Sequence, residues 1–185
     1  APKKARSEEG GITFSDGDAQ HVRFSHSDPL VVDIQMANMM VKRVLVDTGS
    51  SVNILYKSSL ELMKLTVKDL EPCNQTIYGF SGEVLAPTGL IKLPVTTGRT
   101  PATRTLLATF VVVDCPSAYN AVIGRPILVD LQAVISMWHL AMKFPTDAGV
   151  GRVLGNQREA RECYNTSITK AKSGPPRSTA PDRLQ

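Results

Sequence analysis

The clearest candidate for chemistry is an acid that directly follows an apolar run. Residues 44–46 are Val-Leu-Val, and the next four are Asp47, Thr48, Gly49 and Ser50. A short β-branched run followed by turn residues is typical of a buried strand, so the sequence places a carboxylate at the edge of the core. A charge there is costly unless it is hydrogen-bonded or shares a proton. Gly49 lets backbone N–H groups approach the carboxylate, and the Thr48 and Ser50 hydroxyls can donate to it.

An acid in this setting can contribute to peptide hydrolysis. Two carboxylates that share one proton can activate a water molecule and supply a proton donor, and their titrations are coupled. The sequence contains no second Asp-Thr-Gly, since Asp16-Gly17 and Asp114-Cys115 lack an apolar strand before the turn. A two-fold dimer would bring two Asp47 side chains together at its axis. The alternative is an ordinary strand-to-turn exit, for which all four residue types of the turn are typical.

A second stretch repeats the outline of the first. Residues 44–55 and 120–131 both run from an apolar strand through a glycine toward a helix. Aligning Gly49 with Gly124 puts Val122 in the place of the acid. The chain therefore has the outline of two degenerate halves, of which only one kept a carboxylate, and this fits an acid supplied by a partner chain.

Other catalytic and metal-binding arrangements find little support in the sequence. Ser50, His139 and Asp114 are the residue types of a Ser-His-Asp site, but the sequence contains no GxSxG turn. Three cysteines and three histidines are scattered without a CxxC pair, which argues against a metal site and a disulfide framework. We therefore expect no metal and no cofactor, and a reducing compartment such as the cytoplasm.

The apolar pattern predicts a mainly β domain, because Val, Ile, Leu, Met and Thr dominate. Strands are expected over residues 30–36, 40–46, 76–78, 83–95, 104–113, 121–124 and 150–154, and residues 133–144 form one bent or two short strands; residues 52–56 are apolar. Short helices are expected from Ser58 or Ser59 to Leu65, from Arg125 to Leu131, and over residues 157–164. The strands around residues 79–82 would form a hairpin whose glycine-bearing tip exposes Phe80.

Charge and composition divide the chain into one domain with two tails. Residues 1–18 are predicted to be a disordered linker, residues 19–165 the folded domain, and residues 166–185 a basic, Pro/Ser-rich linker. Residues 151–185 contain seven basic and three acidic side chains, which accounts for the whole net charge of +4. The body is neutral, so we expect it to bind no nucleic acid. No run is long enough to span a bilayer and no secretory signal is present, so no membrane partner is expected.

Together these motifs resemble the retropepsins, the aspartic proteases of retroviruses and long-terminal-repeat retrotransposons, over roughly residues 20–165. The resemblance rests on Val46-Asp47-Thr48-Gly49-Ser50, on the flap-like Tyr78-Gly79-Phe80-Ser81-Gly82, and on Val122-Ile123-Gly124-Arg125. Residues 136–146 and the later Arg161-Glu162-Cys163-Tyr164 are similar to plant Ty3/gypsy-type polyproteins in particular. In these, the protease lies between a capsid-type region and a reverse transcriptase.

The resemblance implies a fold and a chemistry. The fold is a retropepsin-like acid protease barrel with one or two short helices and one lobe per chain. Two chains would form a homodimer that cleaves a retroelement polyprotein, in the cytoplasm or in a virus-like particle. One Asp47 would act as general base on the water, and the other, protonated, would donate to the scissile carbonyl oxygen.

The resemblance also implies roles for the neighbouring residues. Thr48 would brace the two active-site turns across the dimer axis, and Gly49 and Ser50 would hydrogen-bond the carboxylates. The hairpin of residues 78–82 would close over an extended substrate as an added strand. Ile123 and Gly124 would form a second turn beneath the two acids.

Two positions depart from the retroviral pattern. In retroviral members the arginine after the second glycine commonly pairs with an acid soon after the catalytic triplet. Near the triplet of this sequence stand Ser51 and Asn53, so the partner of Arg125 is open. Tyr78 resembles the flap tyrosine of pepsin-like enzymes, and its role is open as well.

Two other functions remain compatible with the sequence. One is the retropepsin-like domain of a cellular ubiquitin-shuttle protein. The other is an inactive, element-derived binding module that keeps the fold without turnover.

Overall fold

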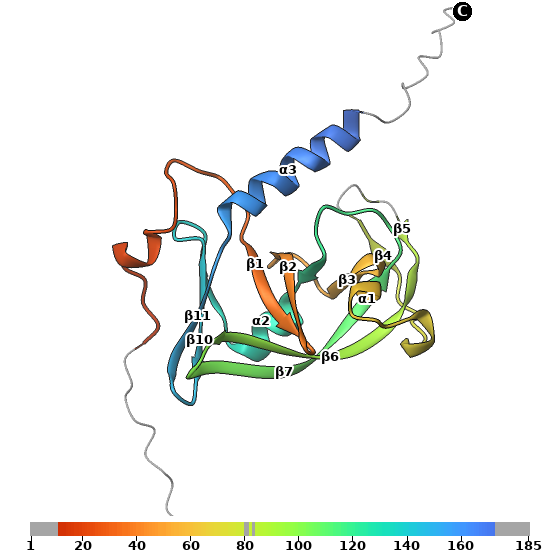
Figure 1. Ribbon diagram of the computed structural model, residues 1–185, viewed down its shortest axis with the longest axis horizontal. Helices are drawn as coiled ribbons and strands as arrows, with labels where there is room; N and C mark the ends of the chain where they lie inside the picture. Colours follow the sequence, from red (N-terminus) through yellow and green to blue (C-terminus); the bar gives the residue numbers. More distant parts are fainter. Residues whose placement is uncertain (1–10, 80–81, 83, 173–185) are drawn as a thin grey trace, which may run out of the picture.

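A closed barrel of six strands forms the centre of the molecule (Figure 1). The computed structural model describes residues 11–79, 82 and 84–172, with side chains described through Ser167. The strand order is β1-β2-β8-β3-β7-β6. The strands are β1 (Val31–Met36), β2 (Met39–Val46), β3 (Asn53–Tyr56), β6 (Pro87–Arg99), β7 (Ala102–Val113) and β8 (Ala121–Ile123). The mainly β barrel expected from the sequence is confirmed.

The core forms because apolar side chains of every barrel strand point inward. Along β1 only Gln35 is exposed and Asp33 is half-buried, while the four apolar residues are buried. Phe110, Leu55 and Ile123 are fully buried at the centre of the same apolar cluster. Burying such side chains contributes roughly 1.5–3 kcal/mol each. The barrel therefore offers a rigid frame for whatever its strand ends carry.

Strand β8 lies between β2 and β3, the strands that precede and follow Asp47 in the sequence. It runs parallel to β2, with Val46 beside Ile123, and antiparallel to β3, with Ile54 beside Val122. The residues after β8 therefore lie directly beside the residues after β2. This crossing brings the two stretches that share an outline into contact.

Smaller elements extend the barrel at both ends (Figure 1). A three-stranded sheet in the order β11-β10-β9 lies at one end, and the two-stranded hairpin β4–β5 lies at the other. The strands are β4 (Ile77–Tyr78), β5 (Val84–Leu85), β9 (Val134–Ser136), β10 (Ala141–Thr146) and β11 (Gly149–Leu154). The helices are η1 (Asp16–Ala19), α1 (Lys57–Leu62), η2 (Val67–Asp69), α2 (Arg125–Leu131) and α3 (Gln157–Lys172). No helix in these described ranges is long and apolar enough to cross a membrane.

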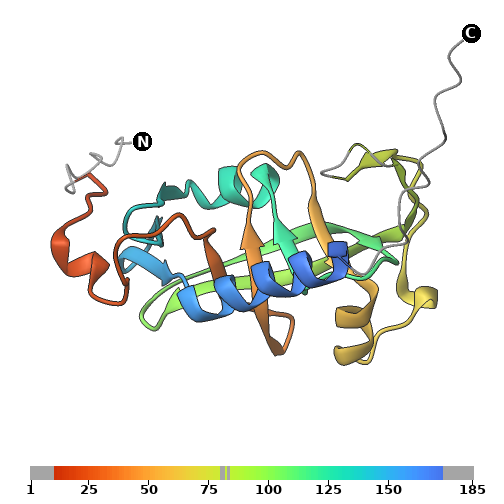
Figure 2. The same ribbon diagram turned by 90° about the horizontal axis from the view of Figure 1, so that it is seen from above.

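Helix α3 lies along one face of the barrel and contacts β1 and β2, as Figure 2 shows from above. Its first residue, Gln157, donates to Arg23 O (3.0 Å) and to Asp28 Oδ2 (2.9 Å). Arg161, one turn later, forms an ion pair with the same Asp28 carboxylate at 3.1 Å. Ala160 and Cys163 are buried against the barrel. These contacts fix the first half of the helix.

A pair of carboxyl groups lies within this helix–barrel interface. Asp33 Oδ1 on β1 and Glu159 Oε2 on α3 are buried, and neither has a hydrogen-bond partner among the described residues. Burial and the neighbouring Asp33 carboxylate raise the pKa of Glu159, while Lys42 and the Arg43 backbone oppose the shift. Two carboxyl groups can form a hydrogen bond with each other only when one carries a proton, so this interface favours a protonated Glu159.

Three expectations from the sequence need correction. Part of the presumed linker is folded, because Asp18 is buried and its carboxylate lies 2.9 Å from Lys143 Nζ. Helix α3 continues to Lys172, through the start of the presumed C-terminal linker. Helix α1 begins at Lys57, because the Ser59 hydroxyl is buried and donates to Asn120 O (2.8 Å) instead of capping the helix. Residues 1–10 and 173–185 lie outside the described part.

Candidate active site

The Asp47 turn begins where β2 ends, and its backbone is fixed on both sides. Asp47 N donates to Ile123 O at 2.9 Å, and Ser50 N donates to Asp47 O at 3.2 Å. Gly49 N donates to Asp47 Oδ1, also at 2.9 Å. The half-buried carboxylate is therefore oriented by a backbone donor two residues away, as a turn of this kind allows.

The Gly124 turn packs against the Asp47 turn so closely that only glycine fits. A Cβ at Gly124 would collide with the Val52 carbonyl oxygen and would lie 2.8 Å from Ser50 O. Arg125 N donates to the same Ser50 O at 2.9 Å. The insertion of β8 therefore places Ile123 and Gly124 beside the Asp47 turn. Their expected role as a second turn beneath two acids stays a prediction.

Asn53 is a site residue that sequence reasoning missed. It is 2% exposed, its Oδ1 accepts from Gly124 N at 3.0 Å, and its Nδ2 donates to Thr109 O at 3.0 Å. A buried amide with both ends bonded holds the Gly124 turn onto the frame of the barrel. The available signal was a polar residue in the otherwise apolar run of residues 52–56.

Arg125 binds backbone and not an acid. Its Nη1 donates to Gly49 O at 2.9 Å and to Thr48 O at 3.2 Å. The guanidinium group thus supplies both carbonyl groups with a charged donor. The open question of its partner is therefore answered within the turn itself: Arg125 ties the second turn to the first.

One expected role in the turn differs in the structure, and a second stays a prediction. The Ser50 hydroxyl donates to Val52 O at 2.7 Å, so the carboxylate receives its bond from the Gly49 backbone and not from this side chain. Thr48 is exposed, and the structure of one chain does not test its predicted contact across a dimer axis.

The β4–β5 hairpin has a glycine on each side of its turn, at Gly79 and Gly82. Ile77 is buried, whereas the neighbouring Tyr78 is 69% exposed and pairs with Val84. Gly82 has a φ of +80°, and its N–H donates to Gly79 O at 3.0 Å. The expected exposure of Phe80 and the position of Ser81 lie outside the described residues.

The rejected Ser-His-Asp grouping is not assembled. His139 Nδ1 lies 2.6 Å from Ser136 Oγ, and Asp114 forms an ion pair with Lys57 at 2.8 Å. Within the described ranges, no group of three or more His, Cys, Asp or Glu side chains could hold a metal ion. The Asp47 turn therefore remains the candidate active site.

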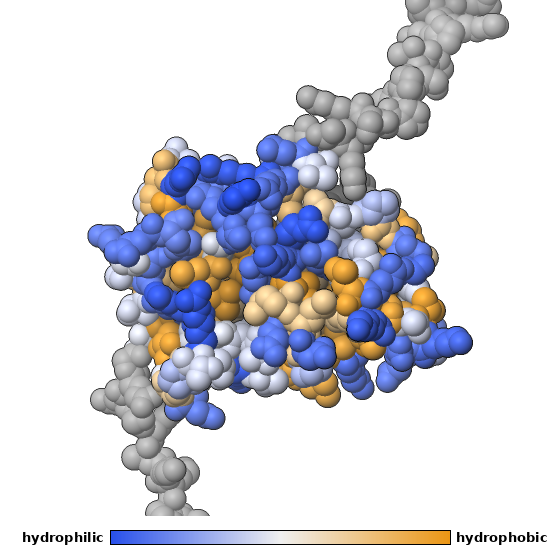
Figure 3. Space-filling model, in the orientation of Figure 1, coloured by the Kyte–Doolittle hydropathy of each residue, from blue (hydrophilic) through white to orange (hydrophobic). Residues whose placement is uncertain are grey.

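Cavity size does not point to this turn. The linings of two cavities, of about 1380 and 420 Å³, do not include residues 47–50. Both lie around α3 and β1–β2, and the face seen in Figure 3 is hydrophilic over α3 with apolar surface below it. The hydrogen-bonded geometry around Asp47, and not a cavity in one chain, identifies the site.

Comparison with known proteins agrees with this geometry at the level of the fold. No protein-family model matches the chain, and no curated protein sequence matches it. Among solved structures, the chain is similar to the retroviral protease-like domain of Ddi1 from Leishmania major. The TM-score is 0.53 at 20% identity, over 71% of this chain and 96% of that one.

Two further solved structures are similar at lower scores. One is the EIAV protease complexed with the inhibitor HBY-793, with a TM-score of 0.45 and 22% identity over 62% of this chain and 99% of that one. The other is a retropepsin-like aspartic protease from Rickettsia conorii, with a TM-score of 0.42 and 15% identity over 66% of this chain and 80% of that one. The match to the Ddi1 domain, at a TM-score of 0.53, shows that the chain has a retropepsin-like fold, as the sequence predicted.

Proposed function

We propose that this protein is an aspartic endopeptidase of the retropepsin type. The observation that carries the proposal is the Asp47 carboxylate, held by Gly49 N at 2.9 Å at the end of a barrel strand. Asn53 and Arg125 fix the neighbouring turn, so the carboxylate sits on a rigid backbone frame. Rigid placement of the reacting group is what general acid–base chemistry requires.

The reaction needs a second carboxylate, which a second copy of the chain would supply. The two Asp47 groups share one proton, because two carboxylates at contact distance cannot both ionise cheaply. The ionised group takes a proton from water as its oxygen attacks the scissile carbonyl carbon. The protonated group gives its proton to the carbonyl oxygen. The carboxyl group that took the water proton then gives it to the leaving nitrogen, while the other carboxylate takes a proton from one hydroxyl of the tetrahedral intermediate. The C–N bond breaks, the carbonyl re-forms, and the pair again holds one proton.

The edge strand β9 is the proposed dimer contact. It pairs with β10 on one side only in the described sheet. Val134, Met137 and Trp138 in and after β9 are 43%, 49% and 64% exposed. Leu140 and Phe144, farther along the same stretch, are fully buried in the core. The proposed interface is therefore limited to residues 134–138.

The proposed substrate is an extended peptide that lies between the Asp47 turns and the β4–β5 hairpins. The exposed Tyr78 and the glycine-bearing tip support a hairpin that bends over bound peptide. We propose a retroelement polyprotein of the Ty3/gypsy type as the natural substrate, in the cytoplasm or in a virus-like particle. The sequence tracts at residues 136–146 and 161–164 support this origin.

The direct test is hydrolysis of a denatured protein by the wild type and by Asp47→Asn. The variant keeps the shape of the turn, because its side-chain oxygen still accepts from Gly49 N. We expect a folded protein with no detectable turnover, and inhibition of the wild type by pepstatin. Wild-type turnover in the purified variant would refute the assignment. A folded wild type with no turnover on any peptide would instead favour the inactive binding module.

A ubiquitin-shuttle type domain is the second candidate. The observation that favours it is the match to the Ddi1 domain, which extends over 96% of that chain. Cleavage of one protein with and without an attached ubiquitin chain separates the candidates. A polyprotein protease should cleave both forms equally, whereas a strict need for ubiquitin would favour the second candidate.

A further inference from the structure

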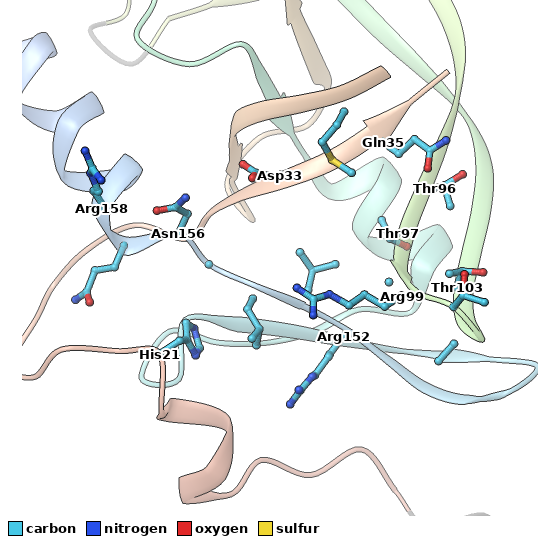
Figure 4. A pocket seen from close by; sticks show the side chains of 18 of the residues that line it. His21, Asp33, Gln35, Thr96, Thr97, Arg99, Thr103, Arg152, Asn156 and Arg158 are labelled. Atoms are coloured by element: carbon cyan, nitrogen blue, oxygen red, sulfur yellow. The ribbon is translucent and has the colours of Figure 1, made fainter. Parts of the chain in front are cut away.

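A polar groove lies on the face covered by α3, away from the Asp47 turn. Strands β1 and β6 pair only through Gln35 with Thr96 and Met36 with Val95, and they diverge beyond these pairs. Strand β11 runs below this opening, and the start of α3 borders it. The space enclosed is about 1380 Å³. The barrel is therefore hollowed at a seam of only two residue pairs, which Figure 4 shows from close by.

Positive charge converges on this groove from four parts of the chain. The basic side chains in its lining are His21, Arg23, Arg99, Arg152, Arg158 and Arg161, and the acidic ones are Asp33 and Glu162. Figure 4 shows Arg99 reaching from the end of β6 over the middle of the groove, with Arg158 on α3 at its far side. Bringing like charges together costs free energy unless an anion offsets it.

Some of these cations are already neutralised, and others are free. Arg161 is paired with Asp28 at 3.1 Å, and Arg152 lies 3.6 Å from Asp18. The guanidinium groups of Arg23 and Arg99 make no ion pair or hydrogen bond to any other described residue. Arg158 is paired with Glu162, but its side chain is 89% exposed, and such surface pairs contribute only about 0–1 kcal/mol. Three guanidinium groups are therefore available to a ligand.

Apolar side chains complete the lining. Met40 and Val150 are 57% and 46% exposed, although both are large apolar residues. Val153 and Leu154 also belong to the lining. Apolar surface below α3 bordered by hydrophilic residues is visible in Figure 3. A ligand that fits must therefore offer both negative charge and apolar groups.

We propose that this groove binds an acidic peptide segment in which carboxylates alternate with apolar side chains. Guanidinium groups bind carboxylates through two parallel hydrogen bonds, and Arg23, Arg99 and Arg158 supply three such forks. The alternation matches the period of an extended chain, whose successive side chains point to opposite sides. The apolar side chains would cover Met40 and Val150.

A single-stranded nucleic acid fits the lining less well. Its recognition depends on bases stacked on aromatic side chains, and the lining contains no Phe, Tyr or Trp. Asp33 and Glu162 would also repel a continuous line of phosphates. The groove therefore favours a peptide, and nucleic acid becomes an outcome of the test.

The test measures, by fluorescence anisotropy, the binding of a labelled peptide to the full chain carrying Asp47→Asn. The peptide has alternating Glu and Leu residues. This variant prevents cleavage of the probe, so the result does not depend on the proposed protease activity. The same peptide with Gln in place of Glu, and a single-stranded RNA of equal length, are the comparison probes. The variant R23Q/R99Q removes the two free cations, and K68Q/K92Q removes two exposed cations outside the groove as a matched control.

We expect the Glu peptide to bind, the Gln peptide to bind far more weakly, and added salt to weaken binding. R23Q/R99Q should lower the affinity about tenfold, as two exposed ion pairs of up to about 1 kcal/mol each allow. K68Q/K92Q should bind as the parent does. Equal affinity for Glu and Gln peptides, or equal losses in both double variants, would overturn the proposal. RNA that binds more tightly than the peptide and loses affinity in R23Q/R99Q would also overturn it.

Discussion

The sharpest structural prediction concerns Asn53, because its amide is the buried link between the Gly124 turn and the barrel. Asn53→Ala removes the acceptor for Gly124 N and the donor to Thr109 O, both at 3.0 Å. A buried group left without a partner costs about 1–3 kcal/mol. The Thr109 carbonyl oxygen has a second lone pair for other hydrogen bonds, so losing the bond from Asn53 should cost an amount at the low end of this range. We expect a total loss of about 3 kcal/mol in the free energy of unfolding.

This loss is a large part of the stability of an ordinary domain, which is about 5–15 kcal/mol. For a chain of this length it corresponds to a drop of about 6–12 °C in Tm. Urea unfolding followed by far-UV circular dichroism measures the free energy, and kcat is measured where the variant remains folded. Since the Gly124 turn braces the Asp47 turn, kcat should fall more than KM changes.

Asn120→Ala is the matched control. Asn120 Nδ2 donates to Lys42 O at 2.7 Å in an exposed setting, where water can replace the bond. We expect a loss of only about 0.5–1.5 kcal/mol and an unchanged kcat. The reasoning is refuted if Asn53→Ala destabilises the protein no more than Asn120→Ala does.

Three further predictions follow from other contacts. Glu159 has a pKa raised above its ordinary value of 4.5, so the folded state binds more protons and its stability should fall as pH rises above that value. In Glu159→Gln the side-chain amide donates to Asp33 at any pH, so the decline in Tm with pH should flatten, and an unchanged decline would contradict a protonated Glu159. Asp18 has a pKa lowered to about 2 by the Ser15 backbone N–H and by Lys143, so its contribution to folding stability is complete above pH 3.8 and is lost as pH falls toward about 2. Asp18→Asn should make residues 11–18 the first site of limited proteolysis at neutral pH, and cleavage no faster than in the wild type would count against this anchor. Trp138→Glu should leave Tm almost unchanged because the side chain is 64% exposed, but it should shift sedimentation toward monomer and lower specific activity with it; full activity in a monomer would exclude the dimer mechanism.

Sequence alone predicted the parts of the site that depend on local pattern. The apolar run before Asp47, the glycine after it and the Gly124 turn are each visible within a few residues. These features specify a strand, an exit and a close approach, because the physics behind them acts over neighbouring positions.

The parts that sequence alone did not predict depend on residues far apart in the chain. Asn53 bonds Gly124 across 71 positions, and Arg125 reaches Gly49 across 76. Lys143 binds Asp18 across 125 positions, which is why a segment without apolar periodicity is nevertheless folded. Only the packing of the barrel brings these groups together, and no periodicity in the sequence encodes such a pairing.

The insertion of β8 between β2 and β3 also sets an order of events during synthesis. Ile123, whose carbonyl accepts from Asp47 N, leaves the ribosome 76 residues after the acid. Until then β2 and β3 are successive strands of the growing chain without β8 between them. If they paired with each other directly, the edges that β8 must pair with would be occupied. Such a hairpin would be a kinetic trap, and long-range strand pairing is slow. The Asp47 turn is therefore made early, but it cannot reach its final hydrogen bonding until β8, 76 residues later, has also been made.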